Sequence, residues 1–299
     1  MASFFRYPGG KAKFKDEILK AIKDTCEGCL EYREPFFGGG SVGLMVIEEN
    51  NPGLAATGLP KFPFETFWIN DKDIGVYSLW RAVVEFPDRL REQIKKYVPK
   101  VDDFEAFKDF FLNGNPDPQT PEEIVDVGFK KLAIHQISYS GLGVKSGGPL
   151  GGKEQKSKYK IDCRWSPNYM EKKLKNVHEQ FKGITRVTNS DFSAMIEDVS
   201  VKAFIYLDPP YYVKGGELYH HSFGEADHIR MAEMLKNTKH SWVLSYDDCP
   251  EVRELYRWAR IEAFDANYTI NGVHTGEIDS DGKKKRASTK KTELLIFPK

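Results

Sequence analysis

Short apolar segments alternate with helical stretches at both ends of this 299-residue chain, and this alternation constrains its fold more than any other feature. The predicted strands are 30–35, 66–69, 184–188, 203–207, 242–246 and 293–297. The predicted helices around them are 12–24, 41–50 and 226–236. Strands that alternate with amphipathic helices are typical of a layered α/β sheet. We therefore expect one sheet built from the two ends of the chain.

The middle of the chain follows a different pattern. Residues 76–180 are mainly helical by periodicity, with a helix start at Thr120-Pro121-Glu122-Glu123 and an amphipathic helix that ends near Phe181. The glycine-rich stretch 141–152 between them predicts a loop or hairpin. We expect residues 1–75 and 181–299 to form the sheet domain and residues 76–180 to form an inserted, mainly helical domain.

The charge of the chain is balanced in total but not along its length. Lys+Arg and Asp+Glu both number 44, yet 151–175 holds eight cations against three anions, and 281–291 holds six against one. Residues 102–126 hold eight acids against Lys108. Basic patches attract phosphates, so the neutral total does not exclude nucleic acid as a partner. Solvated loops are the alternative interpretation of such runs.

Other classes of protein are excluded by composition. No apolar run reaches the ~18 residues of a membrane helix, and the first residues lack the order of a signal peptide. Four cysteines are too few for a disulfide scaffold, which predicts a reduced, cytoplasmic protein. Cys26 and Cys29 have no second pair to complete a four-ligand site, and the histidines show no ligand spacing, so we expect no metal.

A glycine-rich turn is the first candidate site. Gly38-Gly39-Gly40-Ser41-Val42-Gly43 satisfies Gly-x-Gly-x-x-Gly between a predicted strand and a predicted helix. Such a turn lets a ligand approach the backbone and the free N–H groups of the helix start. Asp71 follows the next strand, where a carboxylate can accept both hydroxyls of a ribose. This pattern fits NAD, FAD or S-adenosylmethionine, or a plain turn with a surface acid.

The second candidate site is Asp208-Pro209-Pro210-Tyr211, directly after the apolar strand 203–207. An acid at the end of a buried strand lies at the carboxyl edge of the sheet, where α/β sites form. The two prolines fix the backbone and remove two N–H donors, which leaves carbonyl acceptors beside the carboxylate. Acceptors next to a tyrosine ring suit a planar group that carries an NH2. A rigid turn is the alternative.

Taken together, these motifs resemble those of the Dam-type DNA adenine-N6 methyltransferases, including phage members. Blocks similar to those of the family occur in its order across almost the whole chain: Phe5–Lys11, Glu34–Ser41, Ile69–Asp71, Asp208–Tyr211, Tyr219–Phe223 and Lys290–Leu295. The resemblance implies a Rossmann-like class I methyltransferase sheet. It also implies transfer of a methyl group from S-adenosylmethionine to a flipped-out adenine.

The resemblance also implies roles for the matched residues. The catalytic group would be Asp208, Pro209, Pro210 and Tyr211, with Tyr211 stacked on the adenine. The cofactor would lie against Tyr7, Lys11, Phe37, Gly38, Gly39, Gly40, Asp71, Asp191, Phe192 and Asp208. Transfer from a sulfonium is an in-line displacement that depends mainly on positioning. The adenine must leave the duplex stack to be reached.

Residues 76–180 correspond to the segment in which the family places its DNA-recognition domain. Ser138–Leu142 resembles the start of the recognition hairpin, and Tyr139 would wedge into the base stack. The residues expected to bind DNA are Tyr139, Lys145, Lys153, Lys156, Lys158, Lys160 and Arg164. The Dam subgroup has an arginine where this chain has Val144, and arginine is the usual reader of guanine, which argues against GATC as the target.

Several alternatives remain open from the sequence. The same fold could methylate cytosine N4, a protein amide or RNA, although those classes usually carry Ser or Asn in place of Asp208. A non-catalytic DNA-binding regulator and an NAD enzyme are the other interpretations. The resemblance implies double-stranded DNA as substrate, a monomer, no membrane, and in some settings a cognate restriction endonuclease in a bacterial, archaeal or phage-infected cell.

Overall fold

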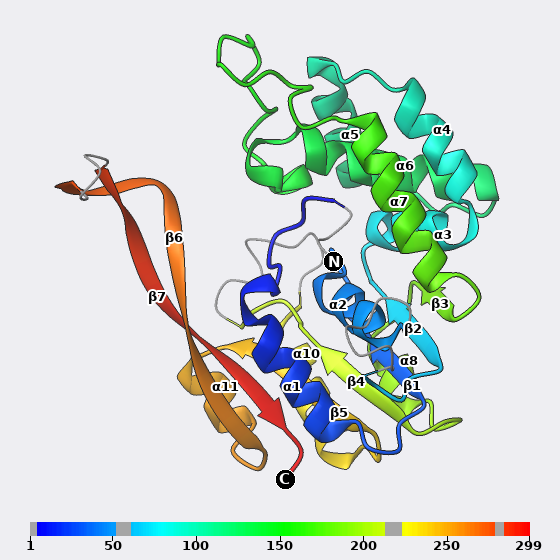
Figure 1. Cartoon of the computed structure of the whole chain (residues 1–299), viewed down its shortest axis with the longest axis vertical. Coiled ribbons are helices and arrows are strands. Elements are labelled where there is room, and N and C mark those ends of the chain that lie inside the picture. The colour runs from blue at the N-terminus through cyan, green and yellow to red at the C-terminus, as the bar shows by residue number, and fades with distance from the viewer. Residues whose placement is uncertain (1–4, 52–60, 213–222, 279–283) are drawn as a thin grey trace.

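The computed structural model describes residues 5–51, 61–212, 223–278 and 284–299 (Figure 1). Within these ranges, the side chains of residues 12, 265–278 and 284–291 are outside the description. The basic residues of 284–291 therefore have a described backbone only, and the predicted segment Tyr219–Phe223 lies outside the described residues except for Phe223.

A seven-stranded sheet forms the centre of the molecule, in the order β3-β2-β1-β4-β5-β7-β6. Its strands are β1 (Glu31–Glu34), β2 (Thr66–Asn70), β3 (Thr185–Thr188), β4 (Ala203–Leu207), β5 (Ser241–Asp247), β6 (Arg260–Ile278) and β7 (Lys284–Phe297). The first five are parallel, and β7 runs antiparallel to both β5 and β6. The expected Rossmann-like α/β fold is confirmed.

The order of the parallel strands reverses between β1 and β4. From β1 the chain proceeds to β2 and β3 on one side, and from β4 to β5 on the other. Loops that leave the carboxyl ends of these two central strands therefore turn to opposite sides, which opens a crevice where ligands bind in such sheets. Both candidate motifs follow these strands: the glycine turn follows β1 and Asp208 follows β4.

The helices that surround the sheet begin and end close to their sequence signals. They are α1 (Lys15–Thr25), α2 (Ser41–Asn50), α3 (Ile74–Glu85), α4 (Pro87–Lys96), α5 (Val101–Asn113), α6 (Pro121–Ile137), α7 (Pro167–Phe181), α8 (Ser193–Glu197), α10 (Glu225–Asn237) and α11 (Pro250–Leu255). Short 3-10 turns occupy η1 (Ala12–Phe14), η2 (Tyr139–Gly141) and η3 (Gly143–Lys145). At the start of α6, the predicted cap residue Thr120 forms a capping box with Glu123.

Two apolar layers cover the two faces of the sheet. Alternate residues of β4 point to opposite faces, so Phe204 and Tyr206 join one cluster while Ile205 and Leu207 join the other. The first layer also contains the buried faces of α1, α2, α3 and α7, and the second contains those of α8, α10 and α11. All five residues of β4 are buried, as expected of a central parallel strand covered on both faces.

The helices of the segment 76–180 pack on the sheet layer and also build a small core of their own. Trp80, Phe129 and Phe181 belong to the first apolar layer. A separate cluster lies farther along the segment and consists of Phe104, Ile134, Ile137, Val144 and Ile161. Figure 1 shows these helices gathered above one end of the sheet, with the chain between α6 and α7 extending outward.

The sequence located the parallel strands but not the antiparallel pair. The predicted strand 293–297 is only the end of β7, and β6 was not predicted at all. Residues 260–278 mix polar and apolar side chains without a continuous apolar run, so only their pairing with β7 defines them as a strand. In Figure 1 these two strands extend together as a long arm from the sheet.

The contact between α3 and α6 depends on Gly128. A Cβ at this position would lie 2.7 Å from the Cα and N of Leu79 and from the carbonyl oxygen of Ser78, all backbone atoms. We expect Gly128→Ala to lower the free energy of unfolding by about 1–3 kcal/mol, because the two helix backbones must separate. Gly147→Ala is the matched control, since nothing lies within 4 Å of that position. Urea unfolding of both variants provides the measurement, and equal stability of the two would contradict this packing.

Candidate active site

Asp208 follows the fully buried strand β4 and is held by two neighbours. The Lys11 ammonium lies 2.8 Å from its Oδ1, and the Ser245 hydroxyl on β5 donates to the same oxygen at 3.0 Å. Only 19% of the Asp208 side chain is exposed. Burial raises the pKa of this carboxyl above its usual value, and Lys11 opposes the rise. Removal from water and the nearby cation therefore have opposite effects on the pKa of Asp208.

Lys11 joins the N-terminal segment to the candidate catalytic tetrapeptide. Its side chain is 3% exposed, and its Nζ donates to the Tyr211 hydroxyl at 2.9 Å as well as to Asp208. Its backbone N–H donates to the Ser41 hydroxyl at the start of α2, at 3.2 Å. One residue thus holds together the ends of β1 and β4, which lie next to each other in the sheet.

Tyr211 is fixed at its hydroxyl end. This hydroxyl donates to the carboxylate of Glu293 on β7, at 2.8 Å from Oε1 and 2.7 Å from Oε2. Glu293 is 4% exposed. The phenol therefore lies between a buried cation and a buried carboxylate.

The glycine turn has a conformation that other residues would strain. Gly38 and Gly40 have φ angles of +49° and +66°, in the left-handed region that favours glycine. A Cβ on Gly38 would lie 2.8 Å from the Tyr7 ring, so the absent side chain also makes room for the N-terminal segment. Trp80 of α3 donates its indole N–H to the Gly38 carbonyl at 2.8 Å and supports the turn from the core.

Asp71, directly after β2, faces the same turn. Its Oδ2 accepts from the Gly38 N–H at 2.8 Å, and its Oδ1 accepts from the Asp73 N–H at 2.9 Å. Burial and the neighbouring Asp73 raise the pKa of Asp71 to about 7. The preceding residue, Asn70, donates to the carbonyls of Pro35 and Ser190, both at 3.0 Å. These bonds hold together the loops after β1, β2 and β3.

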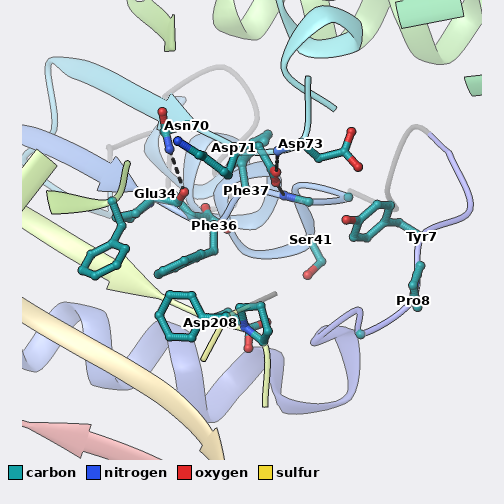
Figure 2. Close-up of a pocket in the computed structure, with 18 of the residues that line it drawn as sticks. Tyr7, Pro8, Glu34, Phe36, Phe37, Ser41, Asn70, Asp71, Asp73 and Asp208 are labelled. Carbon is teal, nitrogen blue, oxygen red and sulfur yellow. Dashed lines mark hydrogen bonds between the residues drawn. The ribbon is translucent and has the colours of Figure 1, made fainter. Parts of the chain in front are cut away.

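A cavity of about 410 Å³ lies in this crevice. Figure 2 shows Asn70, Asp71 and Asp73 along one side, Asp208 on another, and Tyr7 with Pro8 approaching from the N-terminal segment. The sequence-predicted residues that line it are Tyr7, Phe37, Gly38, Gly39, Asp71, Lys145, Asp191, Phe192, Asp208 and Pro210. The predicted residues that are not part of this lining are Lys11, Gly40, Pro209 and Tyr211. Phe37 lines the cavity but is only 3% exposed, and its ring packs on Trp80.

An aromatic group forms the wall beyond Asp208. The rings of Phe36, Phe192 and Phe223 lie within 5.5–5.7 Å of one another, measured between centroids, and all three line the cavity. Arg230 of α10 forms a two-point ion pair with Asp191, at 2.7 and 2.9 Å, and covers the Phe192 ring. This pair holds the pKa of Asp191 well below its usual value.

Two buried residues of α6 also reach the cavity, and sequence reasoning missed them. Lys131 forms an ion pair with Asp73 at 2.6 Å, and His135 contacts the Tyr7 ring at 5.2 Å between centroids. Burial and the nearby Lys131 lower the pKa of His135 to about 3. The neutral ring is close to the Gly141 carbonyl, at 2.8 Å from Nδ1. Their spacing of four residues, which places both side chains on one face of the helix, was the available signal.

The expected DNA-binding residues lie outside the cavity, except Lys145. Tyr139 is 65% exposed, and its backbone N–H bonds to the Gly148 carbonyl in the turn between α6 and α7. Lys153, Lys156, Lys158, Lys160 and Arg164 are all exposed on the segment that follows. Val144 is 7% exposed, packs in the small core of this region and also lines the cavity.

Metal clusters and membrane helices are absent from the described residues. They contain no group of three or more His, Cys, Asp or Glu side chains that could hold a metal ion. None of their helices is long and apolar enough to cross a membrane. Cys26, Cys29 and Cys249 are buried free thiols, and Cys163 is an exposed one.

Comparison with known proteins places this geometry in a family. A family model described as D12 class N6 adenine-specific DNA methyltransferase matches residues 7–270, which is most of the chain. The match includes the glycine turn, Asp71 and Asp208.

Two individual relatives are also similar. The type II methyltransferase M.MjaIII of Methanocaldococcus jannaschii is 25% identical over 255 residues, which cover 78% of each chain. The type II methyltransferase M.CviBI of Paramecium bursaria Chlorella virus NC1A is 21% identical over 295 residues, which cover 94% of this chain and 96% of the relative.

The Lys11–Asp208 pair predicts a pH-dependent effect on stability. Lys11→Met removes one partner of a buried ion pair, which costs about 3–5 kcal/mol, and it raises the pKa of Asp208 further above its unfolded value of about 4. When the pKa of a carboxyl is raised in the folded state, its ionisation destabilises the fold, and this destabilisation is largest above the folded pKa. We therefore expect the loss measured by urea unfolding to be larger at pH 8 than at pH 5.

The double variant Lys11→Met with Asp208→Asn is the control. It places a neutral amide where the carboxylate was, so we expect it to recover much of the lost stability at pH 8. A deficit in Lys11→Met that is the same at both pH values would contradict the electrostatic explanation.

Proposed function

The chain belongs to the D12 class of N6 adenine-specific DNA methyltransferases, and we propose that its cavity holds S-adenosylmethionine on one side of Asp208 and the target adenine on the other. Family membership gives the reaction, which is methylation of adenine N6 in DNA. The observation that carries the residue assignment is that Asp208 lines the same cavity as the glycine turn and Asp71.

The lining has the chemistry that S-adenosylmethionine requires. Asp71 offers carboxylate oxygens for ribose hydroxyls, and the glycine turn brings backbone close to the cavity for the methionine part. The rings of Phe36 and Phe192 offer flat apolar surfaces for the adenine base of the cofactor. The volume of about 410 Å³ is within the usual range of ligand pockets. Tyr7 and Lys11 close this side from the N-terminal segment.

Asp208 and Pro209 are proposed to orient the amino group that is methylated. An exocyclic adenine NH2 is a weak nucleophile because its lone pair is delocalised into the ring. When bound, S-adenosylmethionine supplies the sulfonium methyl group. The Asp208 carboxylate and the Pro209 carbonyl would each accept a hydrogen bond from one N–H of this amino group. These two bonds would point the nitrogen lone pair at the methyl carbon. Positioning of this kind contributes much of the rate in displacement reactions.

Tyr211 is proposed to hold the adenine after it leaves the duplex. Enzymes that act on a base inside DNA must extrude it, at the expense of its stacking energy. A tyrosine ring replaces part of that stacking, which is worth about 1–3 kcal/mol per base. Its place two residues after Pro209, in the same tetrapeptide as Asp208, suits this role.

The segment 76–180 is proposed to be the DNA-recognition domain. Tyr139, exposed at the turn after α6, would enter the base stack, and Lys145 would act at the mouth of the cavity. The basic side chains from Lys153 to Arg164 would contact phosphates. Val144 is buried among apolar side chains, so guanine would be read from another position and a site other than GATC is favoured.

The setting of the enzyme is also part of the proposal. The type II names of the two relatives support a restriction–modification role for this chain, with a cognate restriction endonuclease recognising the same sequence. We propose that the enzyme acts as a monomer on double-stranded DNA inside a bacterial, archaeal or phage-infected cell.

Substitution of Asp208 tests the catalytic assignment. We expect Asp208→Ala to reduce methyl transfer below detection, because the acceptor for the target N–H is removed, while the affinity for DNA changes less than about threefold, because phosphate contacts dominate it. Transfer of tritiated methyl groups and fluorescence anisotropy measure the two quantities. Asp117→Ala, in an exposed loop, is the control. Normal turnover by Asp208→Ala would refute the assignment.

The basic segment between α6 and α7 predicts a salt-dependent interaction. We expect replacement of Lys153, Lys156, Lys158 and Lys160 by Glu to weaken DNA binding and flatten its dependence on salt, by about 0.9 in the logarithmic slope for each phosphate that is no longer neutralised. In the matched control the same replacement by Glu is made at Lys20, Lys23, Lys236 and Lys239, which are exposed on other parts of the surface. Equal salt slopes for the two variants would show that this segment does not contact the DNA backbone.

A further inference from the structure

Glu293 is a buried carboxylate at an unusual place in the sheet. It lies on β7, paired in register with Asp247 of β5, and is followed by the buried apolar residues Leu294 and Leu295. Its exposure is 4%. An ionised group at such a position is unfavourable unless strong partners compensate for the lost water. The backbone pairing of β5 with β7 does not depend on a carboxylate here.

The Tyr211 hydroxyl is one such partner. It donates to both oxygens of Glu293, at 2.8 and 2.7 Å, and it accepts from the Lys11 ammonium at 2.9 Å. Hydrogen bonds to ionised groups are stronger than neutral ones. The hydroxyl oxygen lies on the long axis of the tyrosine side chain, so these bonds fix the direction in which the ring extends from the backbone.

The Lys11 ammonium links the contact between Tyr211 and Glu293 to Asp208, the proposed hydrogen-bond acceptor for the adenine amino group. Lys11 Nζ bonds to Asp208 at 2.8 Å and to Tyr211 at 2.9 Å, and Glu293 lies on the far side of the tyrosine hydroxyl. The carboxylates of Asp208 and Glu293 thus share one ammonium group, one directly and one through the phenol. Displacement of the Tyr211 ring would therefore also disturb Asp208, and these are two of the groups proposed to contact the adenine.

From this geometry we propose that Glu293 is a positioning residue for methyl transfer, which holds the Tyr211 ring in place to receive the flipped adenine. The proposal rests on the stacking role given to Tyr211 above. Without Glu293 the hydroxyl keeps the bond from Lys11 but loses the bonds to the carboxylate, so the tyrosine is less restricted in its χ1 rotamer. The adenine then meets a ring that is correctly placed only part of the time, and its amino group shifts relative to Asp208.

A double-mutant cycle tests the proposal. Glu293→Leu removes the acceptor, and Tyr211→Phe removes the hydroxyl while keeping the ring. We expect each single change to slow single-turnover methylation by about 10–100-fold, as small misplacements do. We expect the double variant to be no slower than Tyr211→Phe alone within about threefold, because Tyr211→Phe already removes the bond to Glu293 together with the bond from Lys11. DNA affinity should stay within about threefold of the unmodified enzyme.

Two further variants separate a positioning role from a structural one. Glu293→Gln keeps an acceptor oxygen for the phenol, so it should retain the rate within about fivefold, and the remaining defect should vanish in the Tyr211→Phe background. This pair keeps the test valid if Glu293→Leu does not fold. Fluorescence of 2-aminopurine at the target position reports stacking, and its quenching in the complex should weaken in Glu293→Leu and in Tyr211→Phe alike.

Each outcome has one meaning. If Glu293→Leu slows methylation by the same factor whether residue 211 is Tyr or Phe, Glu293 does not act through Tyr211 and the proposal is wrong. If Glu293→Leu has the unmodified rate, it is also wrong. Tyr211→Ala tests the underlying function separately, since a normal rate in that variant would overturn the stacking role itself.

Discussion

The buried ion pair between Lys11 and Asp208 is the interaction on which the active site depends. Lys11 comes from the N-terminal segment and Asp208 from the end of β4, so the pair at 2.8 Å closes the crevice from two distant parts of the chain. It also keeps a carboxylate available as an acceptor where burial raises its pKa. The backbone of Lys11 bonds to Ser41, so the same residue fixes the glycine turn relative to Asp208.

The sheet supplies the frame for this pair. Because β1 and β4 are adjacent and the loops that follow them turn apart, the glycine turn after β1 and Asp208 after β4 line one cavity. Asn70 ties the loops after β1 and β3 to β2, and Trp80 supports the glycine turn from the core. The α6 residues Lys131 and His135 reach the same cavity, so the segment proposed to read DNA also forms one of its walls. Cofactor and DNA would therefore meet a single connected surface.

Much of this arrangement is contained in local sequence signals. The continuous apolar run of 203–207 identified β4, and the acid directly after it identified the candidate acceptor. Gly38 and Gly40 marked a turn whose φ angles require glycine. The cap residue Thr120, followed by Pro121 and two acids, marked the start of α6. Each of these signals is carried by neighbours in sequence, which is why it can be read before the chain is folded.

The remaining features depend on contacts between distant segments. Strand β6 lacks an apolar run and is defined by its pairing with β7. Glu293 and Tyr211 are separated by 82 positions, and Lys131 and Asp73 by 58, so no local pattern links them. The sequence divides the chain at 76 and 180, whereas Trp80 and Phe181 share the apolar layer of the sheet. The predicted boundaries rest on the periodicity of apolar residues along the chain. Periodicity does not show that residues on both sides of a boundary pack in one core.

The proposed reaction is tested most directly by mass spectrometry of the nucleosides released from unmethylated double-stranded DNA after incubation with the protein and S-adenosylmethionine. We expect N6-methyladenine as the product, formed only when the cofactor is present. N4-methylcytosine instead, or no modified base from protein that binds both DNA and cofactor, would contradict the proposed reaction.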